Sequence, residues 1–247
     1  MTQDQHEDQR GDRPRGEAPV VVAVDGPAGS GKSSVSREAA RRLGYELLDT
    51  GAAYRAFAWH ALDRGVDLDG PAEQVAREVV PLLAGFDEAY AIALAPGERW
   101  VRVGERDVSD AIRDTAISQR VSAIARVPEV RQALTERFRR FLRDTAAPGI
   151  IAEGRDITTV VAPDADARIL LTADERVRIA RRAAEKSSDD AAAVAASVAA
   201  RDAKDRQVVD FLTAAEGVDL LDSTELDFEQ TVARMLEIIR AARPDTN

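Results

Sequence analysis

Gly26-Pro-Ala-Gly-Ser-Gly-Lys-Ser33 follows an apolar run, Val20–Asp25 (VVVAVD), and opens a segment with helical periodicity over Lys32–Leu43. The pattern G-x-x-x-x-G-K-[S/T] between a strand and a helix is typical of a phosphate-binding loop, or P-loop. Its glycines let backbone N–H groups converge on phosphate oxygens, and the helix that follows presents its positive end to the same anion. The sequence therefore predicts binding of ATP or a closely related nucleoside triphosphate.

Two side chains of this loop predict chemistry beyond binding. Lys32 places a compact charge near the β- and γ-phosphates, and the hydroxyl of Ser33 is suited to Mg²⁺ that arrives with ATP. The predicted ATP-binding residues are Gly26, Pro27, Ala28, Gly29, Ser30, Gly31, Lys32, Ser33 and Ser34.

The composition of the 247-residue chain excludes several other kinds of site. The chain contains no cysteine, which rules out disulfides, thiolate metal sites and cysteine nucleophiles. Its net charge of −10 disfavours nonspecific binding to nucleic acid or membranes. No apolar stretch approaches the ~20 residues that cross a bilayer, and no signal-peptide pattern is visible. We expect a soluble, cytoplasmic protein whose partners are small molecules, with no nucleic acid and no membrane.

Short apolar strands alternate with amphipathic helices, which predicts an α/β fold with a mostly parallel sheet flanked by helices. The predicted strands are Val20–Asp25, Tyr45–Leu48, Gly149–Ala152, Ala167–Leu171 and Val218–Leu221. The predicted helices are Lys32–Leu43, Thr50–Arg64, Ile112–Ile124, Pro128–Leu142 and Asp227–Arg240, and a capping box at Thr172-x-x-Glu175 opens one more.

Three segments differ from this alternation. Residues 1–19 are polar and without periodicity, which predicts a disordered tail. Gly65–Val108 reads as an inserted unit, with a helix over 72–83 and two antiparallel strands over 90–94 and 99–103 around a Pro-Gly turn. Ser187–Ala200 is low in complexity, and both a mobile helical flap and a plain surface helix remain open for it.

Arginines and carboxylates follow two of the predicted strands. Arg55 ends the stretch LDTGAAYR after the second strand, and Glu153-Gly-Arg155-Asp156 follows the third. Ligands of open α/β sheets bind beyond the carboxyl ends of the strands, so Arg55 and Arg155 should both face the same cleft as the P-loop. Guanidinium groups suit phosphate oxygens and neutralise a phosphoryl group in transfer. We therefore predict a small-molecule phosphotransferase in which Lys32, Arg155 and Asp156 are catalytic.

Other features of the sequence give weaker evidence about function. A GTPase would carry an N-K-x-D motif, which is absent, and no apolar run ending in Asp-Glu suggests a motor ATPase. Arg178, Arg181 and Arg182 lie on the helix that leads into the low-complexity segment, where closure over the phosphates and an ordinary solvated face are both open. His6 and His60 have no partner pattern and are interpreted as incidental.

Seven stretches together resemble bacterial cytidylate kinases, which are nucleoside monophosphate kinases that move the γ-phosphoryl group of ATP onto CMP or dCMP. They are VDGPAGSGKSS, LLDTGAAYR, DVSDAIR, VSAIARVPEVRQAL, IAEGRDITTVVAPDA, ARDAKDR and LLDST. The resemblance extends from Val20 to about Arg240. It implies a P-loop kinase core over 20–64 and 109–247, a nucleoside-monophosphate-binding (NMP-binding) subdomain over 65–108 and a short lid at about 183–207.

The resemblance also implies a CMP site and Mg²⁺ bound with ATP. Ser122, Arg131 and Asp156 would recognise cytosine, Arg55 and Arg155 would hold the acceptor phosphate, and Arg201 and Asp205 would contact the sugar. The implied CMP-binding set is Thr50, Tyr54, Arg55, Ser122, Arg131, Arg155, Asp156, Arg201 and Asp205.

One departure from the family pattern concerns the lid. The family reads R-D-x-x-D-x-x-R there, and Val208 stands where the last arginine belongs, with Arg206 nearby as a substitute. This puts the strength of acceptor-phosphate binding in question. Two alternatives therefore stay open: a P-loop kinase for another small acceptor such as UMP, shikimate or dephospho-coenzyme A, and a nucleotide-binding regulator without turnover. The lack of a long exposed apolar stripe favours a monomer.

Overall fold

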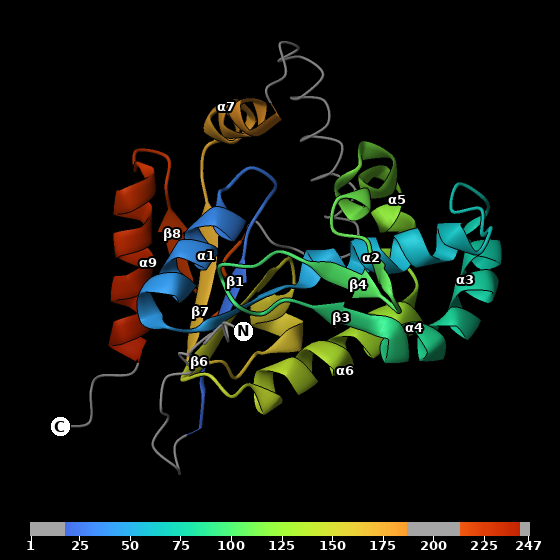
Figure 1. Cartoon of the computed structure of the whole chain (residues 1–247). Helices are drawn as coiled ribbons and strands as arrows, with labels where there is room; N and C mark the ends of the chain where they lie inside the picture. Colours follow the sequence, from blue (N-terminus) through green and yellow to red (C-terminus); the bar gives the residue numbers. More distant parts are fainter. Residues whose placement is uncertain (1–17, 187–212, 243–247) are drawn as a thin grey trace, which may run out of the picture.

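The structure, a computed structural model, describes residues 18–186 and 213–242. Its centre is a sheet of five parallel strands in the order β2-β6-β1-β7-β8 (Figure 1). The strands are β1 Val20–Asp25, β2 Glu46–Asp49, β6 Gly149–Gly154, β7 Ala167–Thr172 and β8 Asp219–Asp222. The predicted α/β fold with a parallel sheet is confirmed, and each predicted strand is present within about two residues of its expected limits.

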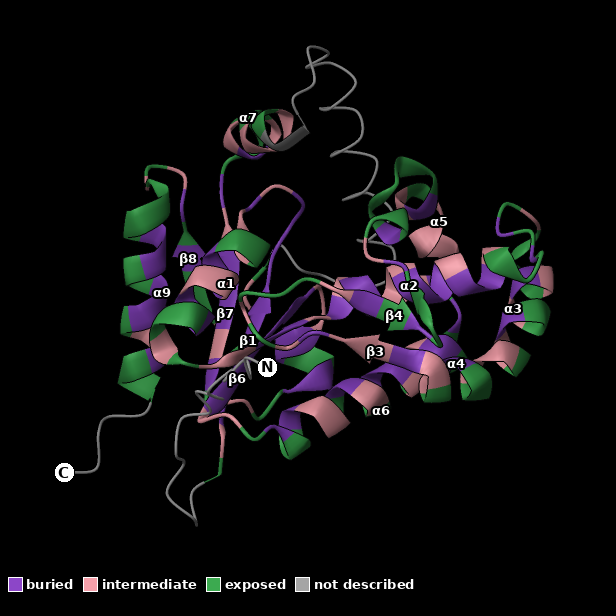
Figure 2. Cartoon of the chain, in the orientation of Figure 1, coloured by how far each residue is buried: buried purple, intermediate pink, exposed green. Residues whose placement is uncertain are grey.

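Side chains alternate between the two faces of this sheet, and each face has its own apolar cluster. Val22 and Val24 of β1 belong to the cluster under α1 (Lys32–Leu43) and α9 (Phe228–Ala242). Ala23 belongs to the opposite cluster, under α2 (Thr50–Asp63) and α6 (Pro128–Asp144). The buried residues follow these interfaces (Figure 2). β1 is thus buried on both faces, as a central parallel strand requires.

The segment predicted as an insert contains its own antiparallel sheet, which confirms that expectation. The sheet is β3-β4-β5, with β3 Tyr90–Ile92, β4 Val101–Val103 and β5 Arg106–Asp107. The two-residue β5 was not predicted, because it is too short and charged to show an apolar pattern. Before the sheet come α3 Ala72–Val79, a 3₁₀ turn η1 Val80–Leu82, and α4 Leu83–Ala89.

The prediction of one helix over 72–83 was wrong in its last four residues, and α4 was missed. Pro81 stands inside η1, where its missing N–H and fixed φ interrupt the α-helical hydrogen bonds. The apolar side of the insert packs against α2 and α6: Phe57, Phe86 and Tyr90 share one cluster with Phe138. The domain limits of the sequence analysis stay a prediction, because this cluster runs across them.

Two further helix starts differ from the prediction. Residues 111–113 form a 3₁₀ turn (η2, Ala111–Arg113), and α5 begins only at Thr115 (Thr115–Ala125) because Asp114 caps it by accepting from Ala116 N. The capping box at Thr172 was wrong. Thr172 is the last residue of β7, and Asp174 Oδ1 accepts from Arg176 N at the start of α7 (Glu175–Lys186). Pro128 does occupy the first turn of α6, as predicted.

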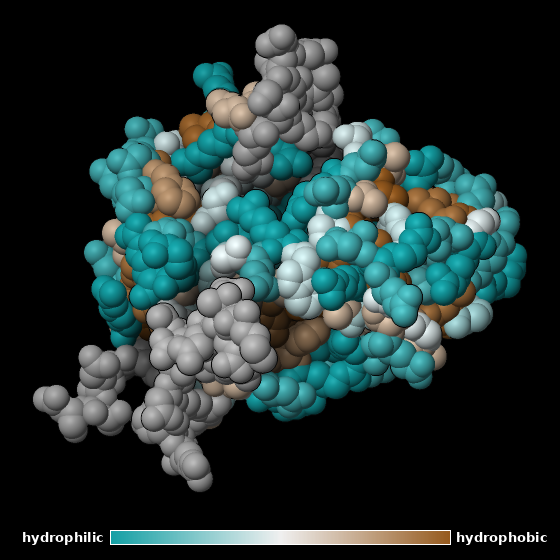
Figure 3. Space-filling view, viewed as in Figure 1, coloured by the Kyte–Doolittle hydropathy of each residue, from teal (hydrophilic) through white to brown (hydrophobic). Residues whose placement is uncertain are grey.

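The surface in the view of Figure 3 is mostly hydrophilic, with hydrophobic residues in separate patches. The large hydrophobic side chains that are most exposed among the described residues are Val160, Leu220 and Phe228, on three different elements. In this part of the chain, no helix is both long and apolar enough to cross a membrane.

Candidate active site

The five parallel strands bring their carboxyl ends to one edge of the sheet. Asp25, Asp49 and Gly154 end β1, β2 and β6 there, and the strand register pairs Asp25 with Gly154 and Asp49 with Glu153. The loops that leave this edge carry the P-loop, the start of α2 and the segment Arg155–Asp156. The three segments therefore lie at one edge of the sheet, and it stays a prediction that Arg55 and Arg155 face one cleft there.

The P-loop has the backbone of an anion site. Gly29 and Gly31 adopt left-handed φ angles of 76° and 86°, which L side chains rarely adopt. Gly31 is also the N-cap of α1 and has no side chain to occupy the free N–H groups of the first turn. The buried hydroxyl of Ser30 has no hydrogen-bond partner among the described residues. Backbone and hydroxyl donors thus fit the phosphate groups of a nucleotide.

Two of the predicted lid arginines support this loop from α7. Arg178 is 5% exposed, and its Nη1 donates to Ala28 O at 2.9 Å. Arg181 Nη1 lies 3.3 Å from Ser30 O and 2.9 Å from Ser223 Oγ. A Cβ at Gly29 would lie 2.5 Å from the carbonyl oxygen of Arg178, so only glycine allows this approach. The structure therefore places both side chains against P-loop carbonyls; Arg182 lies partly buried on the same helix, and closure over the phosphates stays a prediction.

Glu153 joins the two functional residues of the P-loop, and the sequence analysis did not assign it. Ser33 Oγ donates to Glu153 Oε1 at 2.5 Å, and Lys32 Nζ lies 3.8 Å from Glu153 Oε2. Thr50 Oγ1 donates to the carbonyl of Glu153 at 2.8 Å. Burial and the neighbouring carboxylate of Asp49 raise the pKa of Glu153 above its usual range. Its place at the end of a buried strand was the signal available in the sequence.

The residues beside the P-loop fit a magnesium ion bound through ATP. A hydroxyl and a carboxylate, Ser33 and Glu153, already lie together there, and both are oxygen ligands of the kind Mg²⁺ prefers. No group of three or more His, Cys, Asp or Glu in the described parts of the chain could hold a metal ion by itself.

The predicted acceptor side consists of arginine–carboxylate pairs. Arg55 Nη2 lies 2.9 Å from Asp49 Oδ2, and Arg131 Nη2 lies 2.9 Å from Asp156 Oδ2. Burial raises the pKa of Asp156, against the opposing effect of Arg131. Burial and the charge of Asp156 also raise the pKa of Tyr54, which packs against Phe138 of α6. The structure therefore brings Tyr54, Arg131 and Asp156 together.

The remaining predicted residues lie in three places. Arg155 Nη1 donates to Gly26 O at 2.5 Å, so this side chain lies against the P-loop. Thr50 is buried at the start of α2, and Ser122 lies partly buried on α5, which packs against α2. Arg201, Asp205 and Val208, and most of the predicted lid, lie outside the described residues.

His60 was interpreted as incidental, and the structure gives it a packing role. It is 2% exposed and packs beside both Phe57 and Phe86, with ring centroids 6.3 and 5.4 Å away. Arg64 Nη1 lies 2.8 Å from His60 Nδ1, and because a guanidinium only donates, Nδ1 carries no proton. Burial and the charge of Arg64 lower the pKa of His60 to about 4.

Comparison with known proteins identifies the family. The family model for cytidylate kinase matches residues 22–241. A cytidylate kinase of Cutibacterium acnes is 42% identical over 223 residues, which are 90% of this chain and 96% of that protein. The cytidylate kinase of Rhodococcus jostii is 43% identical over 225 residues (89% and 94%), and that of Exiguobacterium sibiricum 38% over 230 (90% and 98%).

A solved structure supports the fold alone. An uncharacterized protein from Eubacterium ventriosum is 10% identical, with a TM-score of 0.50 over 90% of this chain and 99% of that one. The family match spans the P-loop, the arginine–carboxylate pairs and the insert between them, and the relatives are covered over almost their whole length. The chain therefore belongs to the cytidylate kinase family of phosphotransferases, as the seven sequence stretches had indicated.

Proposed function

We propose that the protein transfers the γ-phosphoryl group of ATP to CMP or dCMP, giving ADP and CDP or dCDP. The observation that carries this proposal is that the P-loop and the segment Arg155–Asp156 leave the same edge of the sheet. There a backbone-built phosphate loop stands beside an arginine–carboxylate pair, Arg131–Asp156, that matches a pyrimidine base. The family to which the chain belongs supports the same reaction.

ATP is the ligand of the P-loop in this proposal. The N–H groups of residues 26–34 and the first turn of α1 bind its phosphates, and Lys32 neutralises charge on the γ-phosphoryl group. Ser33 and Glu153 would hold Mg²⁺, which would offset the negative charge of the ATP phosphates. Arg178 and Arg181 keep the loop carbonyls turned toward α7, which leaves the N–H groups for the phosphates.

CMP is the ligand of the acceptor side. A guanidinium donates and a carboxylate accepts, so Arg131 and Asp156 together match the carbonyl oxygen, ring nitrogen and amine of cytosine. Ser122 is the third residue proposed to contact the base. Arg201 and Asp205, which lie outside the described residues, are proposed to contact the sugar hydroxyls.

The acceptor phosphate binds to two arginines that have protein partners in this structure. Arg55 Nη2 contacts Asp49 and Arg155 Nη1 donates to the carbonyl of Gly26, so a bound phosphate would compete with these partners. The Nε atom of Arg55 is buried without a hydrogen-bond partner in the described part of the chain, so a phosphate oxygen would satisfy it. Thr50 and Tyr54 line the same side in this proposal.

The reaction is an in-line displacement. A phosphate oxygen of CMP forms the new bond to the γ-phosphorus, and the bond from that phosphorus to the β-phosphate oxygen of ATP breaks, releasing ADP. The attacking group is already an anion, so no general base is required. Lys32, Arg55 and Arg155 stabilise the charge that spreads over the transferring oxygens, and positioning supplies the rest of the acceleration.

A panel of acceptors tests this proposal. ATP consumption and product formation are measured with CMP, dCMP, UMP, shikimate and dephospho-coenzyme A under identical Mg²⁺ concentrations. Turnover with CMP and dCMP alone is the expected result. Turnover with a different acceptor makes the protein a P-loop kinase of other specificity, and binding of ATP without any turnover makes it a regulator. A cytoplasmic location and a monomeric state stay predictions beside this proposal.

A further inference from the structure

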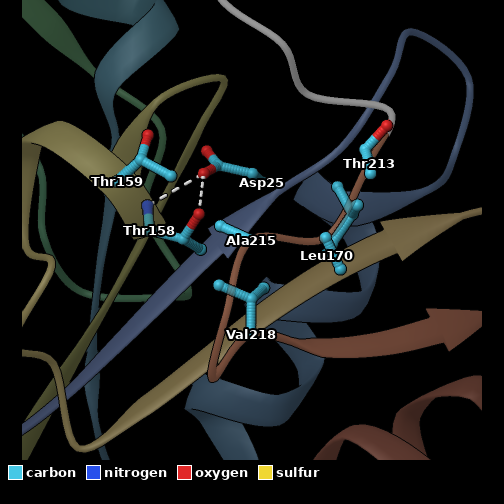
Figure 4. Close-up of a pocket in the computed structure, with 8 residues that line it drawn as sticks. Asp25, Thr158, Thr159, Leu170, Thr213, Ala215 and Val218 are labelled. Carbon is cyan, nitrogen blue, oxygen red and sulfur yellow. Dashed lines mark hydrogen bonds between the residues drawn. The ribbon is translucent and has the colours of Figure 1, made fainter.

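Asp25 has three hydrogen bonds to a loop that no part of the proposed mechanism explains. It is the last residue of β1, is 3% exposed, and stands directly before the P-loop. Its Oδ1 accepts from Ile157 N at 2.9 Å, and its Oδ2 accepts from Thr158 N at 2.8 Å and from Thr158 Oγ1 at 2.6 Å. Figure 4 shows the carboxylate with the two contacts from Thr158.

The two backbone donors, Ile157 N and Thr158 N, are the first N–H groups of a single π-helical turn, η3, which spans Ile157–Val161. The residue before a helical turn normally caps such N–H groups with its own side chain, and Asp is among the best residues for that role. Asp156 occupies this position, yet its side chain makes no capping bond. Its Oδ2 instead lies 2.9 Å from Arg131 Nη2. Asp25 therefore caps η3 from a neighbouring strand, in place of Asp156.

A second contact runs in the opposite direction between the same two segments. Arg155 Nη1 donates to the carbonyl of Gly26, the residue that follows Asp25. The strand register pairs Asp25 with Gly154, so both contacts lie at the carboxyl ends of the neighbouring strands β1 and β6. The P-loop and the segment Arg155–Asp156 are thus fixed to each other by side chains from both sides.

From this geometry we infer that Asp25 is a positioning residue for the acceptor nucleotide, because its capping of η3 leaves the Asp156 carboxylate free to pair with Arg131 and bind the base. The inference rests on the proposed function. Without the Asp25 carboxylate, the N–H groups of Ile157 and Thr158 are unpaired, and Asp156 is the nearest carboxylate along the chain that can cap them. Arg131 then loses its partner, and the base site loses its carboxylate.

Small substitutions at Asp25 and Thr158 test this arrangement. A cavity of about 260 Å³ lies beside the carboxylate and is lined by Thr158, Thr159, Leu170 and Val218 among others (Figure 4). Asparagine has the shape of aspartate but replaces one of its two oxygens with an NH₂ donor, so it loses the acceptor for either Ile157 N or Thr158. Thr158→Val removes one donor to Asp25 from the opposite side and leaves the residue before the P-loop unchanged.

The experiment measures KM for CMP and for ATP, kcat, and the thermal unfolding midpoint of five proteins: wild type, Asp25→Asn, Thr158→Val, Thr158→Ser and Thr159→Val. We expect Asp25→Asn to raise KM for CMP by about tenfold or more and KM for ATP by less than about twofold. Thr158→Val should raise KM for CMP by about threefold, and Thr158→Ser, which keeps the hydroxyl, should restore it. Thr159→Val is the matched control: it is exposed, and we expect unchanged constants.

Equal increases of both KM values in Asp25→Asn, or unchanged KM for CMP, would overturn the inference, since either result assigns Asp25 to the P-loop or to the fold alone. If Asp25→Asn does not fold, the Thr158 pair decides: Thr158→Ser without recovery overturns it equally. Failure of the proposed function is a separate result, because wild-type protein would then show no CMP turnover at all.

Discussion

The proposed donor and acceptor sides of the site use different chemical groups to bind their ligands. The P-loop would bind phosphate mostly through its backbone N–H groups, and Arg178 of α7 holds one of its carbonyl groups. The acceptor side is made of arginine side chains that are paired with carboxylates of the same protein, Arg55 with Asp49 and Arg131 with Asp156. We therefore expect the donor side to be formed before ATP binds, and part of the acceptor side to exchange partners when CMP binds.

This difference has an energetic reason. The four paired side chains are between 13% and 29% exposed, so an isolated charge among them would be costly. Pairing offsets the charge of each arginine in the absence of CMP, and at Arg55 a substrate phosphate would compete with the internal partner. A backbone N–H, in contrast, has no charge to be neutralised. Changes on the donor side should therefore mainly lower kcat, and changes on the acceptor side should mainly raise KM for CMP.

The largest effect is expected on the donor side. Lys32→Ala should lower kcat by about a thousandfold, because the charge on the transferring phosphoryl group loses its nearest cation. KM for CMP should change far less, since Lys32 lies at the end of the P-loop. Steady-state kinetics with CDP as the detected product provide the test, and an unchanged thermal unfolding midpoint is the control for folding. Substantial CDP formation by the variant would contradict both the mechanism and the comparison.

The matching change on the acceptor side is Arg131→Ala. It removes a charged donor to the base and leaves Asp156, only 13% exposed, without its partner, so KM for CMP should rise by about a hundredfold. KM for ATP should stay within about twofold. Arg143→Ala is the matched control, because Arg143 is an exposed arginine near the end of the same helix, α6. If KM for ATP rose as much as KM for CMP, the two sides would not be independent.

The donor side was also the easier one to predict from sequence. The P-loop, β1 and α1 are adjacent in the chain, so a local pattern determines them, and their predicted limits match the structure. The prediction failed where a residue that the pattern did not take into account changed the local structure. Pro81 ends the α-helical pattern of α3, and Asp174 replaces the predicted Thr172 cap.

On the acceptor side, the resemblance identified Arg131 and Asp156, but local patterns gave no reason for their pairing. Asp156 reads as an ordinary helix cap in the sequence, because the residue that replaces it, Asp25, is 132 positions from Ile157. The contact of Arg155 with Gly26 spans 129 positions. Such contacts depend on strand order, which the sequence pattern does not specify. The role of Glu153 was missed for the same reason, since its partner Ser33 is 120 positions away, in the first turn of α1.

A smaller change tests the departure from the family pattern. Val208→Arg restores an arginine to the lid motif, and if the acceptor phosphate is weakly held, KM for CMP should fall by about tenfold, the value of one charge-assisted contact. KM for ATP should not change. Arg206→Ala is the companion variant: a rise in KM for CMP would identify Arg206 as the substitute. Unchanged KM for CMP in Val208→Arg would mean that this position does not limit acceptor binding.

The smallest effect concerns the apolar cluster next to the proposed acceptor side, where His60 packs beside Phe57 and Phe86. Its pKa in the folded protein is about 4, below the ordinary value of 6.5, so the unfolded chain binds a proton that the folded protein excludes. Stability is therefore retained above pH 6.5 and lost as the pH falls from 6.5 toward 4. Between about pH 7 and about pH 5.5, wild type should lose about 1 kcal/mol more unfolding free energy than His60→Gln.

Denaturant unfolding of both proteins at each pH measures this difference directly. The amide that His60→Gln introduces still accepts from Arg64 but has no proton to bind, so this variant is the matched control for the charge. Hydrogen exchange locates the effect: acid should speed exchange in α2, which carries His60, before α1, which packs in the other cluster. Parallel loss of stability in the two proteins would show that His60 is not the titrating group. Equal exchange in α1 and α2 would show instead that the two sides of the sheet unfold as one unit.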